Sequence, residues 1–571
     1  MPLVTIPQHI TMNKSEKYIL NKLKLLYMSQ SEISYLYLEP KINNLLPDFI
    51  LIDPMRGVMV IEVKAWDINY IQTITPKEVE TYKQEKLENP AYKTRRYFNT
   101  LQNIFKAKKE LIDKQNNLKF SLFATLCFTE LKKEDVIFYN FKELLDYYPI
   151  KVFYKNDLAS LTLKTLFKNP QPIEKSILDI IRTTIFPEIK IIKKKNSLID
   201  SKIIALDIEQ ERFAKNIPFG HYMVTGLPGS GKSVVLLSRA IHLAKMFPNW
   251  NILILTYNKA LKSELEHKIN NIKEDLALLE IEINNIEITT FHKKAFRISK
   301  IDSREYPNKD DNFWQNIVVN NALESVKEEY DAILIDEYQD FYKSWFELVI
   351  KMTKEHYYED KKVKNIFLAG DRLQSIYNPK DINWKQDIGL DMRGRSKLLK
   401  KSYRLHQEHM KLGLFILSKS KKYQDEIKKF YELESNNNFT YAKDGSIELL
   451  KGEDKDIAHK LKELFKVYNF EDILLLAPSW DRIREIKKAL GASFNALICS
   501  SKDLDNTKAI FTTYYSAKGI EAKIVLVIDM QEIKERKLFY VALTRASNKV
   551  ILHASTFEAN DITKDVISYV S

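Results

Sequence analysis

Two hydrophobic patterns divide the chain. Before about residue 185, a helical segment at 15–28 precedes an apolar strand at 49–52, a turn at 53–57 and a second strand at 58–63. Strand, turn and strand in this order predict a β-hairpin within a mixed α/β domain. After about residue 203, short runs that are apolar throughout alternate with longer helical stretches, and the runs lie at 252–255, 332–335, 366–368, 473–476, 509–512, 524–528 and 550–552. Such runs suit strands covered on both faces, so they predict parallel, doubly wound sheets.

The number of strands is too large for one modest sheet, and it predicts an α/β multidomain protein. We expect an N-terminal α/β domain at 1–190, a basic linker at 191–202, and two further α/β domains at 203–395 and 396–571. The Lys-rich stretch 187–202 is equally compatible with a solvated surface strand.

Composition narrows the class of partner. Lys and Arg number 89 against 76 Asp and Glu, which gives a net charge of +13 and favours nucleic acid over membrane as a partner. No apolar run is long enough to span a bilayer, and we expect no membrane association. The two cysteines stand outside any metal-ligand spacing, which fits a reducing cytoplasm.

The strongest motif is a complete P-loop at 226–233, between the apolar segment 222–225 and a helical run at 234–246. A Gly-rich loop ahead of a helix directs backbone N–H groups at phosphate oxygens. The predicted ATP-binding residues are Gly226, Gly229, Ser230, Gly231, Lys232 and Ser233. Lys232 would reach the β- and γ-phosphates, and the Ser233 hydroxyl would bind Mg²⁺.

A second carboxylate motif completes the expected nucleotide site. Asp336 and Glu337 follow the apolar run 332–335. Asp336 can hold the Mg²⁺ shell, and Glu337 can polarise the attacking water. An Asp-Glu pair is common on surfaces, but after a buried strand downstream of a P-loop it indicates ATP hydrolysis.

From here the chain resembles the UvrD/Rep-like superfamily 1 helicases, because further motifs of that family follow in order over 203–571. The resemblance implies two RecA-like domains and single-stranded or partly duplex DNA as partner. It implies an adenine contact for Gln210, a γ-phosphate sensor at Gln374, adenine stacking by Tyr403, nucleotide contact by Glu521, and arginine fingers at Arg404 and Arg545. Arginines from a second domain stabilise transition-state charge only when the cleft closes, which ties hydrolysis to movement.

Aromatic and polar residues beside these motifs are candidates for the nucleic-acid contact. The resemblance places Tyr257, Asn258, Phe291, His292 and Tyr377 at the strand groove, with Trp384 as a further aromatic candidate. Aromatic faces stack bases with little sequence preference, although core packing is an equal explanation for most of these rings.

The sequence also departs from the helicase pattern. Tyr515 stands where the family usually has His, and Pro379 where it often has Trp. The short interval between Arg404 and Thr512 predicts a short accessory insertion, and 261–285 predicts a single charged amphipathic helix. Processive unwinding is therefore less strongly implied than ATP-driven movement.

The predicted hairpin near the N-terminus carries a different chemistry. Asp48 follows Pro47, and Glu62 and Lys64 lie two residues apart on an otherwise apolar strand, as in the PD…ExK pattern of restriction-type nucleases. Asp48, Glu62 and a further carboxylate, Glu16, could hold Mg²⁺ or Mn²⁺, and Lys64 could orient water. A buried Glu–Lys ion pair or an edge strand explains the same residues without catalysis.

The segment 47–66 also resembles the nuclease-related domain called NERD, and Asn89-Pro90 is similar to a later element of that family, although a glutamine expected beyond Pro90 is not evident. The resemblance implies a restriction-endonuclease-like nuclease domain. Three functions stay open: a nuclease–helicase fusion in phage defence or DNA repair, an ATPase motor with a non-cleaving N-terminal domain, and an interaction module switched by ATP.

Overall fold

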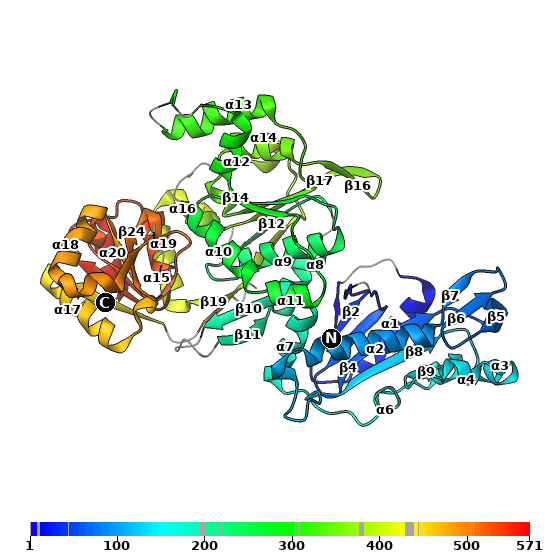
Figure 1. The fold of residues 1–571 in the computed structure, drawn as a ribbon. Helices are drawn as coiled ribbons and strands as arrows, with labels where there is room; N and C mark the ends of the chain where they lie inside the picture. Colours follow the sequence, from blue (N-terminus) through cyan, green and yellow to red (C-terminus); the bar gives the residue numbers. More distant parts are fainter. Residues whose placement is uncertain are drawn as a thin grey trace. The chain divides into compact units, whose positions relative to one another are not determined.

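The computed structural model describes residues 2–7, 12–43, 45–194, 201–216, 219–302, 304–306, 309–375, 382–428, 439–442, 445–501, 503, 505 and 507–570. These residues fall into two compact units. The first comprises 1–218, 241–248 and 270–283, and the second comprises 219–240, 249–269 and 284–571. Figure 1 gives the elements of each.

The first unit is built on a six-stranded mixed sheet in the order β1-β2-β3-β4-β8-β9. Its strands are β1 (Leu3–Ile6), β2 (Ser34–Leu38), β3 (Phe49–Asp53), β4 (Gly57–Lys64), β8 (Leu122–Phe128) and β9 (Lys151–Phe153). The pairs β2–β3 and β3–β4 are antiparallel, and the other neighbours are parallel.

The predicted hairpin is confirmed as β3 and β4. Its turn depends on Gly57, which has a φ of +122° and would place a Cβ 2.3 Å from the Ser121 carbonyl oxygen. A side chain at this position would be strained in backbone and blocked by its neighbour, so only glycine fits.

Two long helices pack against this sheet. Helix α1 (Lys14–Tyr27) presents Ile19 and Leu23 to a core that includes Leu36 and Leu51 of the sheet. Helix α2 (Pro90–Lys106) contacts β4 and β8. A small antiparallel sheet of β5 (Ile71–Ile74), β6 (Glu78–Thr81) and β7 (Lys86–Glu88) lies between β4 and α2 in the chain. The remaining helices before the linker region are α3 (Lys133–Phe138), α4 (Lys142–Leu145), α5 (Lys155–Ala159), α6 (Leu163–Leu166) and α7 (Lys175–Ile185).

The region predicted as a basic linker contains two paired strands. Strands β10 (Lys190–Lys194) and β11 (Ser201–Ala205) run antiparallel, with Lys190 opposite Ala205. Residues 195–200 lie outside the described residues.

The helix after this pair, α8 (Ile208–Asn216), is joined to the N-terminal part of the chain by buried charges. Arg182 of α7 donates to Glu211, and Lys215 bridges Glu211 at 2.9 Å and Glu188 at 3.3 Å. Buried ions persist only when they are paired, so this chain of ion pairs fixes α8 to α7. Helix α8 therefore groups with the first unit, whereas the predicted boundary at 203 assigned it to the next domain.

The second unit has two lobes, each built on a parallel sheet. The first sheet has the order β14-β13-β15-β17-β12-β18. Its strands are β12 (His221–Gly226), β13 (Ile252–Thr256), β14 (Ile286–Thr290), β15 (Ala332–Asp336), β17 (Lys361–Ala369) and β18 (Ser396–Leu399), and β16 (Glu355–Tyr358) pairs antiparallel with β17. Strand β18 carries this lobe past the predicted boundary at 395.

The second sheet is parallel throughout, in the order β21-β26-β25-β22-β24-β23. Its strands are β21 (Ser446–Lys451), β22 (Ile473–Ala477), β23 (Ile498–Ser500), β24 (Ala509–Thr513), β25 (Ala522–Val527) and β26 (Ala546–Ala554). The apolar runs from 473 onward are confirmed as strands of this sheet, with hydrophobic clusters on both faces. Strand β19 (Lys401–His406) pairs separately with β20 (Thr440–Ala442).

Helices cover both sheets of the second unit. Those of the first lobe are α12 (Phe291–Ser299), α13 (Val318–Ser325) and α14 (Lys343–Met352), and those of the second are α15 (Gln407–Ser418), α16 (Lys421–Ile427), α17 (Asp454–Val467), α18 (Trp480–Leu490), α19 (Arg536–Leu543) and α20 (Asp561–Val570). Helix α9 (Lys232–Met246) follows β12 and contributes residues to both units.

The single helix predicted over 261–285 is wrong. The chain forms α10 (Lys259–Asn270) and α11 (Lys273–Leu278), with a break between them. Two consecutive asparagines, at 270 and 271, stand at the break. Asparagine favours turns over helix interiors because its side chain competes for backbone hydrogen bonds, which accounts for the interruption.

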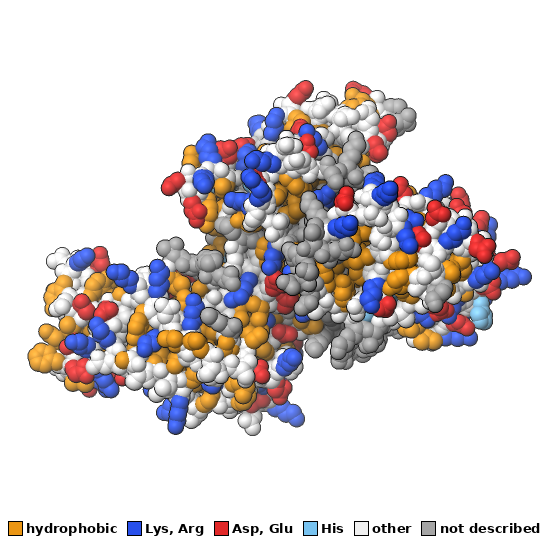
Figure 2. Space-filling view, turned by 180° about the vertical axis from the view of Figure 1, so that it is seen from behind, with side chains coloured by type: hydrophobic (Ala, Val, Ile, Leu, Met, Phe, Trp, Pro, Cys, Tyr) orange, Lys and Arg blue, Asp and Glu red, His pale blue; other side chains and the backbone are white. Residues whose placement is uncertain are grey.

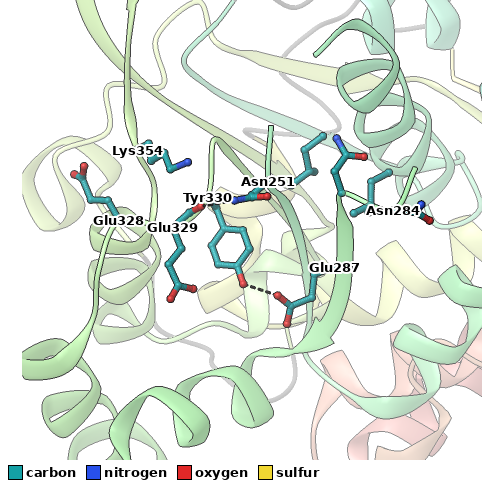
Figure 3. A pocket seen from close by; sticks show the side chains of 10 residues that line it. Asn251, Asn284, Glu287, Glu328, Glu329, Tyr330 and Lys354 are labelled. Carbon is teal, nitrogen blue, oxygen red and sulfur yellow. Dashed lines mark hydrogen bonds between the residues drawn. The ribbon is translucent and has the colours of Figure 1, made fainter. Parts of the chain in front are cut away.

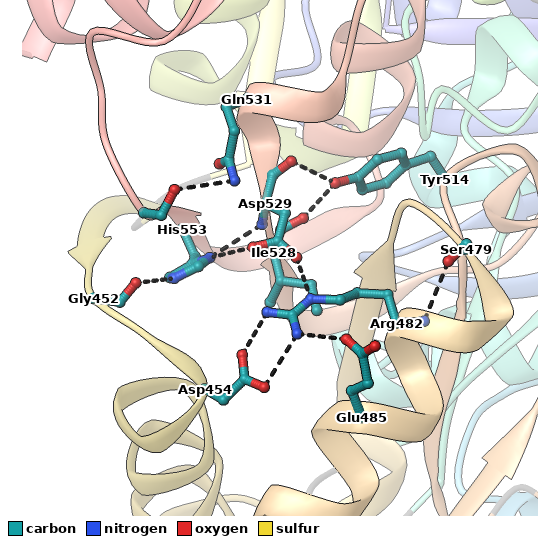
Figure 4. A network of polar contacts seen from close by, with 11 residues as sticks. Gly452, Asp454, Ser479, Arg482, Glu485, Tyr514, Ile528, Asp529, Gln531 and His553 are labelled. Atoms are coloured by element: carbon teal, nitrogen blue, oxygen red, sulfur yellow. Dashed lines mark hydrogen bonds and ion pairs between the residues drawn. The ribbon is translucent and has the colours of Figure 1, made fainter.

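A polar network ties the helices of the second lobe to the ends of its strands (Figure 4). Arg482 of α18 contacts Asp454, Glu485 and Asp529, with its Nε 2.6 Å from Asp529 Oδ2. His553 Nδ1 accepts the Asp529 backbone N–H at 3.0 Å, and His553 Nε2 lies 3.2 Å from the Gly452 carbonyl oxygen. The neutral imidazole tautomer with hydrogen on Nε2 satisfies both contacts.

The surface shows no segregation of charge on the face that Figure 2 displays, where Lys and Arg are interspersed with Asp and Glu. Within the described ranges, no helix is both long enough and apolar enough to cross a membrane.

Candidate nucleotide site and a second carboxylate site

The P-loop joins the carboxyl end of β12 to the first residue of α9, as predicted. Gly229 has a φ of +71°, and a Cβ there would lie 2.7 Å from the Arg404 Cβ. The Lys232 ammonium donates to the carbonyl oxygens of Gly226 and Leu227, both at 3.0 Å. The loop thus encloses its lysine, and glycine permits the close approach of Arg404 from the second lobe.

Asp336 ends β15 inside the same lobe and is 1% exposed. Burial raises the pKa of Asp336 to about 7, the neighbouring Glu337 adds to the rise, and a hydrogen bond from Ser233 opposes it. Asp336 Oδ2 is buried with no hydrogen-bond partner among the described residues. A buried carboxylate oxygen beside a serine hydroxyl suits a hard cation such as Mg²⁺, so these two residues fit the predicted metal role.

Glu337 adopts a left-handed conformation with a φ of 55°. Burial acts to raise its pKa, but the charges of Lys518 and then Lys232 outweigh burial and hold the pKa below its usual range. Gln339 donates to the Glu337 carboxylate and accepts the Asp371 backbone N–H at 3.1 Å. An ionised, oriented carboxylate is the form that can accept a proton from water.

Two arginines reach this site from the second lobe. The Arg545 guanidinium donates to Gln374 Oε1 at 2.8 Å, and Arg404 pairs with Glu521 and donates to the Thr544 carbonyl at 3.2 Å. Burial lowers the pKa of both guanidiniums, to about 9 for Arg404, where the charge of Arg545 adds to the effect. Both stay protonated at neutral pH, so two positive charges face the carboxylates of the first lobe.

Strand β19, which carries Arg404, is hydrogen-bonded directly to the P-loop. The Tyr403 N–H donates to the Gly229 carbonyl at 3.0 Å, and the Ser402 hydroxyl donates to the Pro228 carbonyl at 2.7 Å. The predicted residues of both lobes therefore meet in one site.

Sequence reasoning gave no role to Lys518, which is a buried link between the lobes. Its side chain is 1% exposed, its ammonium donates to Asp340 and to the Gln374 carbonyl at 2.8 Å, and it lies 3.9 Å from Glu337 Oε2. The signal in the sequence was its position between Tyr515 and Glu521, both of which the helicase resemblance had singled out. Gln339, inside the segment after Glu337, was missed in the same way.

Gln210 lies on α8 in the first unit and is 3% exposed. Its backbone N–H donates to Asp207 Oδ1 at 2.9 Å, and its side-chain oxygen accepts the Asp207 N–H at 3.4 Å. These contacts form a cap at the helix start. Its role in adenine recognition stays a prediction.

The residues predicted to contact nucleic acid have different surroundings in the structure. Tyr257 and His292 are half-buried at the carboxyl ends of the neighbouring strands β13 and β14, with ring centroids 5.5 Å apart. The Asn258 side chain instead accepts the Leu261 N–H at the start of α10. Tyr377 lies outside the described residues.

Phe291, which was predicted to contact nucleic acid, is instead a core residue. It is 1% exposed, and its ring stacks on Trp345 with centroids 4.1 Å apart. Removing this ring from the core to stack on a base would cost its hydrophobic burial, so Phe291 is a packing residue. Trp384 likewise packs its ring against Tyr338 and Phe346.

A pocket of about 520 Å³ lies at the opposite edge of the first-lobe sheet (Figure 3). It is lined by Asn251 and Asn285, which precede β13 and β14, and by Glu287 and Tyr330, which are hydrogen-bonded to each other. The P-loop follows β12 and Asp336 is the last residue of β15, so the nucleotide site lies at the carboxyl ends of the strands and this pocket is separate from it.

The first unit brings the predicted nuclease residues together. Asp48 Oδ2 accepts the Val63 N–H at 2.5 Å, which places Asp48 beside Glu62 and Lys64 at the end of β4. Burial raises the pKa of Asp48 to about 7, and Glu62 adds to the rise. Glu62 is 0% exposed, and Lys64 Nζ lies 2.6 Å from its Oε1.

One member of this site was not predicted. Lys93, on the first turn of α2, lies 2.9 Å from the same Glu62 Oε1. The Asn89-Pro90 pair, which is similar to an element of the NERD family, stands just before Lys93, but the sequence analysis gave Lys93 itself no role. Glu62 Oε2 is buried and has no hydrogen-bond partner within the described ranges.

Glu16, the predicted third carboxylate, accepts hydrogen bonds from Asn13 in a capping box at the start of α1. Its negative charge nevertheless contributes to raising the pKa of Asp48 and of Glu39. Among the described residues, no group of three or more His, Cys, Asp or Glu is arranged to hold a metal ion.

Comparison with known proteins bears mainly on the second unit. Residues 210–380 match the model of an AAA domain, and residues 508–553 match that of a UvrD-like helicase C-terminal domain. The chain is 25% identical over 281 residues to a probable DNA helicase II homologue of Mycoplasma genitalium, an alignment that covers 47% of this chain and 38% of that relative. The matched regions contain the P-loop, Asp336, Lys518 and Arg545, so this chain is similar to UvrD-like helicases at the residues of its nucleotide site.

Proposed function

We propose that this chain is an ATP-driven DNA helicase or translocase. The observation that carries the proposal is the junction of the two lobes, where Arg404 and Arg545 face Glu337 and the P-loop. The match to a UvrD-like helicase C-terminal domain and the similarity to a probable DNA helicase II homologue support the same activity.

The chemistry follows from these groups. Lys232 and the P-loop N–H groups would bind the phosphates, and Ser233 with Asp336 would hold Mg²⁺, which neutralises phosphate charge when bound. Glu337 would orient and deprotonate the attacking water. Arg404 and Arg545 would stabilise charge on the transferred phosphoryl group, with Gln374 positioned by Arg545.

Movement would result because the two halves of the site belong to different lobes. Nucleotide binding favours the closed arrangement, and hydrolysis removes the γ-phosphate that the arginines contact. Each cycle can then advance a bound single strand, for which Tyr257 and His292 are the candidate contacts in the first lobe.

The test is ATP hydrolysis and duplex unwinding with and without single-stranded DNA. We expect DNA to stimulate hydrolysis by the full chain and Lys232→Ala to abolish both activities. Hydrolysis that does not respond to DNA would contradict the motor assignment, and stimulated hydrolysis without unwinding would limit it to translocation.

We further propose that the N-terminal domain is a metal-dependent DNA nuclease of the NERD and restriction-endonuclease-like kind. Two observations support it. The first is the topology: strands β2, β3 and β4 form an antiparallel meander, and β8 joins it in parallel to β4. Helices α1 and α2 pack on this sheet. Asp48, Glu62 and Lys64 also converge at the end of β4.

The buried, unpartnered Glu62 Oε2 fits a cation ligand because a carboxylate oxygen without a donor is costly unless something binds it. Asp48 and Glu62 would hold Mg²⁺ or Mn²⁺, which polarises the scissile phosphate when bound. Lys64 would orient the attacking water.

Cleavage of plasmid and single-stranded DNA with Mg²⁺ or Mn²⁺ tests this second activity. We expect Lys64→Ala to abolish cleavage and Lys232→Ala to change only its dependence on ATP. If the full chain does not cut while DNA still stimulates its ATPase, the N-terminal domain is a non-cleaving binding module.

A role in phage defence would follow from joining a motor to a nuclease. Cells that carry Lys64→Ala should then lose protection from phage. Undiminished protection in that variant would exclude nuclease-dependent defence and leave DNA repair or a motor-only role.

A further inference from the structure

Two lysine ammonium groups pair with one carboxylate oxygen of Glu62, and its other carboxylate oxygen has no such partner among the described residues. Lys64 Nζ and Lys93 Nζ lie 2.6 Å and 2.9 Å from Glu62 Oε1, and Glu62 Oε2 is buried without a hydrogen-bond partner among the residues that the structure describes. The PD…ExK pattern accounts for Lys64. It does not account for Lys93.

Lys93 is presented by a rigid element. Helix α2 begins at Pro90, and Asn89, which is 0% exposed, accepts the Ala91 N–H and donates to the Thr75 carbonyl at 2.9 Å. The Lys93 ammonium also lies 5.4 Å from the centre of the Tyr97 ring. The helix start is therefore fixed, and the lysine side chain is directed at Glu62 from outside the sheet.

The three partners differ in their freedom to move. The Glu62 side chain is 0% exposed, whereas those of Lys64 and Lys93 are 23% and 30% exposed. A lysine has a flexible four-carbon stem and can turn its ammonium toward another anion, but the buried carboxylate cannot leave. Only Lys93 comes from an element other than β4, so it can approach a phosphate without disturbing that strand.

We propose that Lys93 is an exchangeable counter-ion of the nuclease site: it neutralises Glu62 before DNA binds, competes there with a divalent cation, and transfers to a DNA phosphate when the strand arrives. The proposal rests on the proposed nuclease function. Transfer of the ammonium to phosphate leaves Glu62 available to the cation. Metal and DNA therefore bind cooperatively, and cation loading depends on the presence of substrate.

The charges set the sign of the effect. When Asp48 is ionised, as metal binding requires, Asp48 and Glu62 carry two formal negative charges and Lys64 and Lys93 carry two positive ones, so the site without DNA offers a divalent cation no net attraction. Removing the Lys93 charge leaves one net negative charge and removes a cation next to the ligand oxygen. We expect metal affinity to rise by roughly tenfold, within the range that groups around metal ligands control.

The experiment is calorimetric titration of the full chain with Mn²⁺, with Glu62→Gln as the baseline that removes binding at this site. Lys93→Gln should bind Mn²⁺ roughly tenfold more tightly than the wild type while cleaving DNA more slowly. Lys93→Arg keeps the charge and should keep the wild-type affinity. Lys109→Gln, which removes an exposed lysine from the same domain, is the matched control and should leave the affinity unchanged.

The coupling is measured by repeating the titrations with a phosphorothioate single strand, which resists cleavage. The strand should tighten Mn²⁺ binding in the wild type and have little effect in Lys93→Gln. Equal or weaker Mn²⁺ binding by Lys93→Gln overturns the proposal, as does equal DNA coupling in both proteins. A thermal unfolding transition like that of the wild type, followed by circular dichroism, verifies that a variant is folded. A wild type that binds Mn²⁺ as expected but does not cut would refute the nuclease function alone.

Discussion

Replacing Lys518 with methionine tests the junction of the two lobes. Lys518 is 1% exposed, and its main partner, Asp340, is 0% exposed. Lys518→Met keeps the length and apolar stem of the side chain, but it removes the ammonium that pairs with the Asp340 carboxylate and lies 3.9 Å from Glu337 Oε2.

The magnitude follows from burial. Breaking a buried ion pair by removing one partner costs about 3–5 kcal/mol, because the remaining charge is desolvated and uncompensated. At about 1.4 kcal/mol per factor of ten, the folding equilibrium should shift by at least about a hundredfold. Asp340→Asn alone should have a similar effect, since it leaves the Lys518 ammonium buried.

The double variant separates pairing from packing. Lys518→Met with Asp340→Asn contains neither charge, so its loss of stability should be smaller than the sum of the two single losses by roughly 1–3 kcal/mol. Lys508 and Asp505 form an ion pair at 3.3 Å with side chains 38% and 39% exposed. The matched variant Lys508→Met should leave stability nearly unchanged.

Urea denaturation followed by tryptophan fluorescence measures these differences, because Trp314, Trp345 and Trp384 lie in or against the core of the first lobe. Additive losses in the double variant would refute the assignment of Lys518 as the buried partner of Asp340. So would a Lys518→Met midpoint equal to that of Lys508→Met.

Three further predictions concern catalysis, pH and DNA contact. Arg545→Lys should lower the turnover of DNA-stimulated ATP hydrolysis by roughly a thousandfold or more, because lysine lacks the planar, bidentate guanidinium. Unchanged turnover in a steady-state assay would contradict the role of Arg545 as an arginine finger. Burial lowers the pKa of His553, so its stabilising contribution is complete above the ordinary value of about 6.5 and is lost as pH falls below it. His553→Asn retains an acceptor for the Asp529 N–H and should flatten the dependence of thermal stability on pH in that window; an unaltered slope would exclude His553 as its source. Tyr257→Ala should weaken single-strand affinity in fluorescence anisotropy by roughly 1–3 kcal/mol, whereas Phe291→Leu should lower stability and spare affinity, and the reverse outcome would restore Phe291 as a base contact.

Much of the architecture follows from local pattern. Uninterrupted apolar runs predict the strands of both parallel sheets because such strands are covered on two faces, and the structure confirms them at Ile252–Thr256 and Ile473–Ala477. The P-loop and Asp336 were also predictable, since phosphate binding requires glycines and a helix start within a few residues, and a metal carboxylate at a strand end is a local signal.

Other features depend on residues that are distant in the chain. Lys518 and Asp340 are 178 positions apart, and Lys93 and Glu62 are 31 apart. Each lysine taken alone is indistinguishable from a solvated one, and only the folded packing shows which carboxylate it neutralises. The same holds for Phe291, whose place in a motif predicts contact with DNA and whose burial against Trp345 assigns it to the core. The sequence by itself determined the strands and the phosphate-binding loop, because those depend on neighbouring residues. Only the tertiary structure decided which charges pair and which rings are buried, because burial and Coulomb energy depend on distance in space.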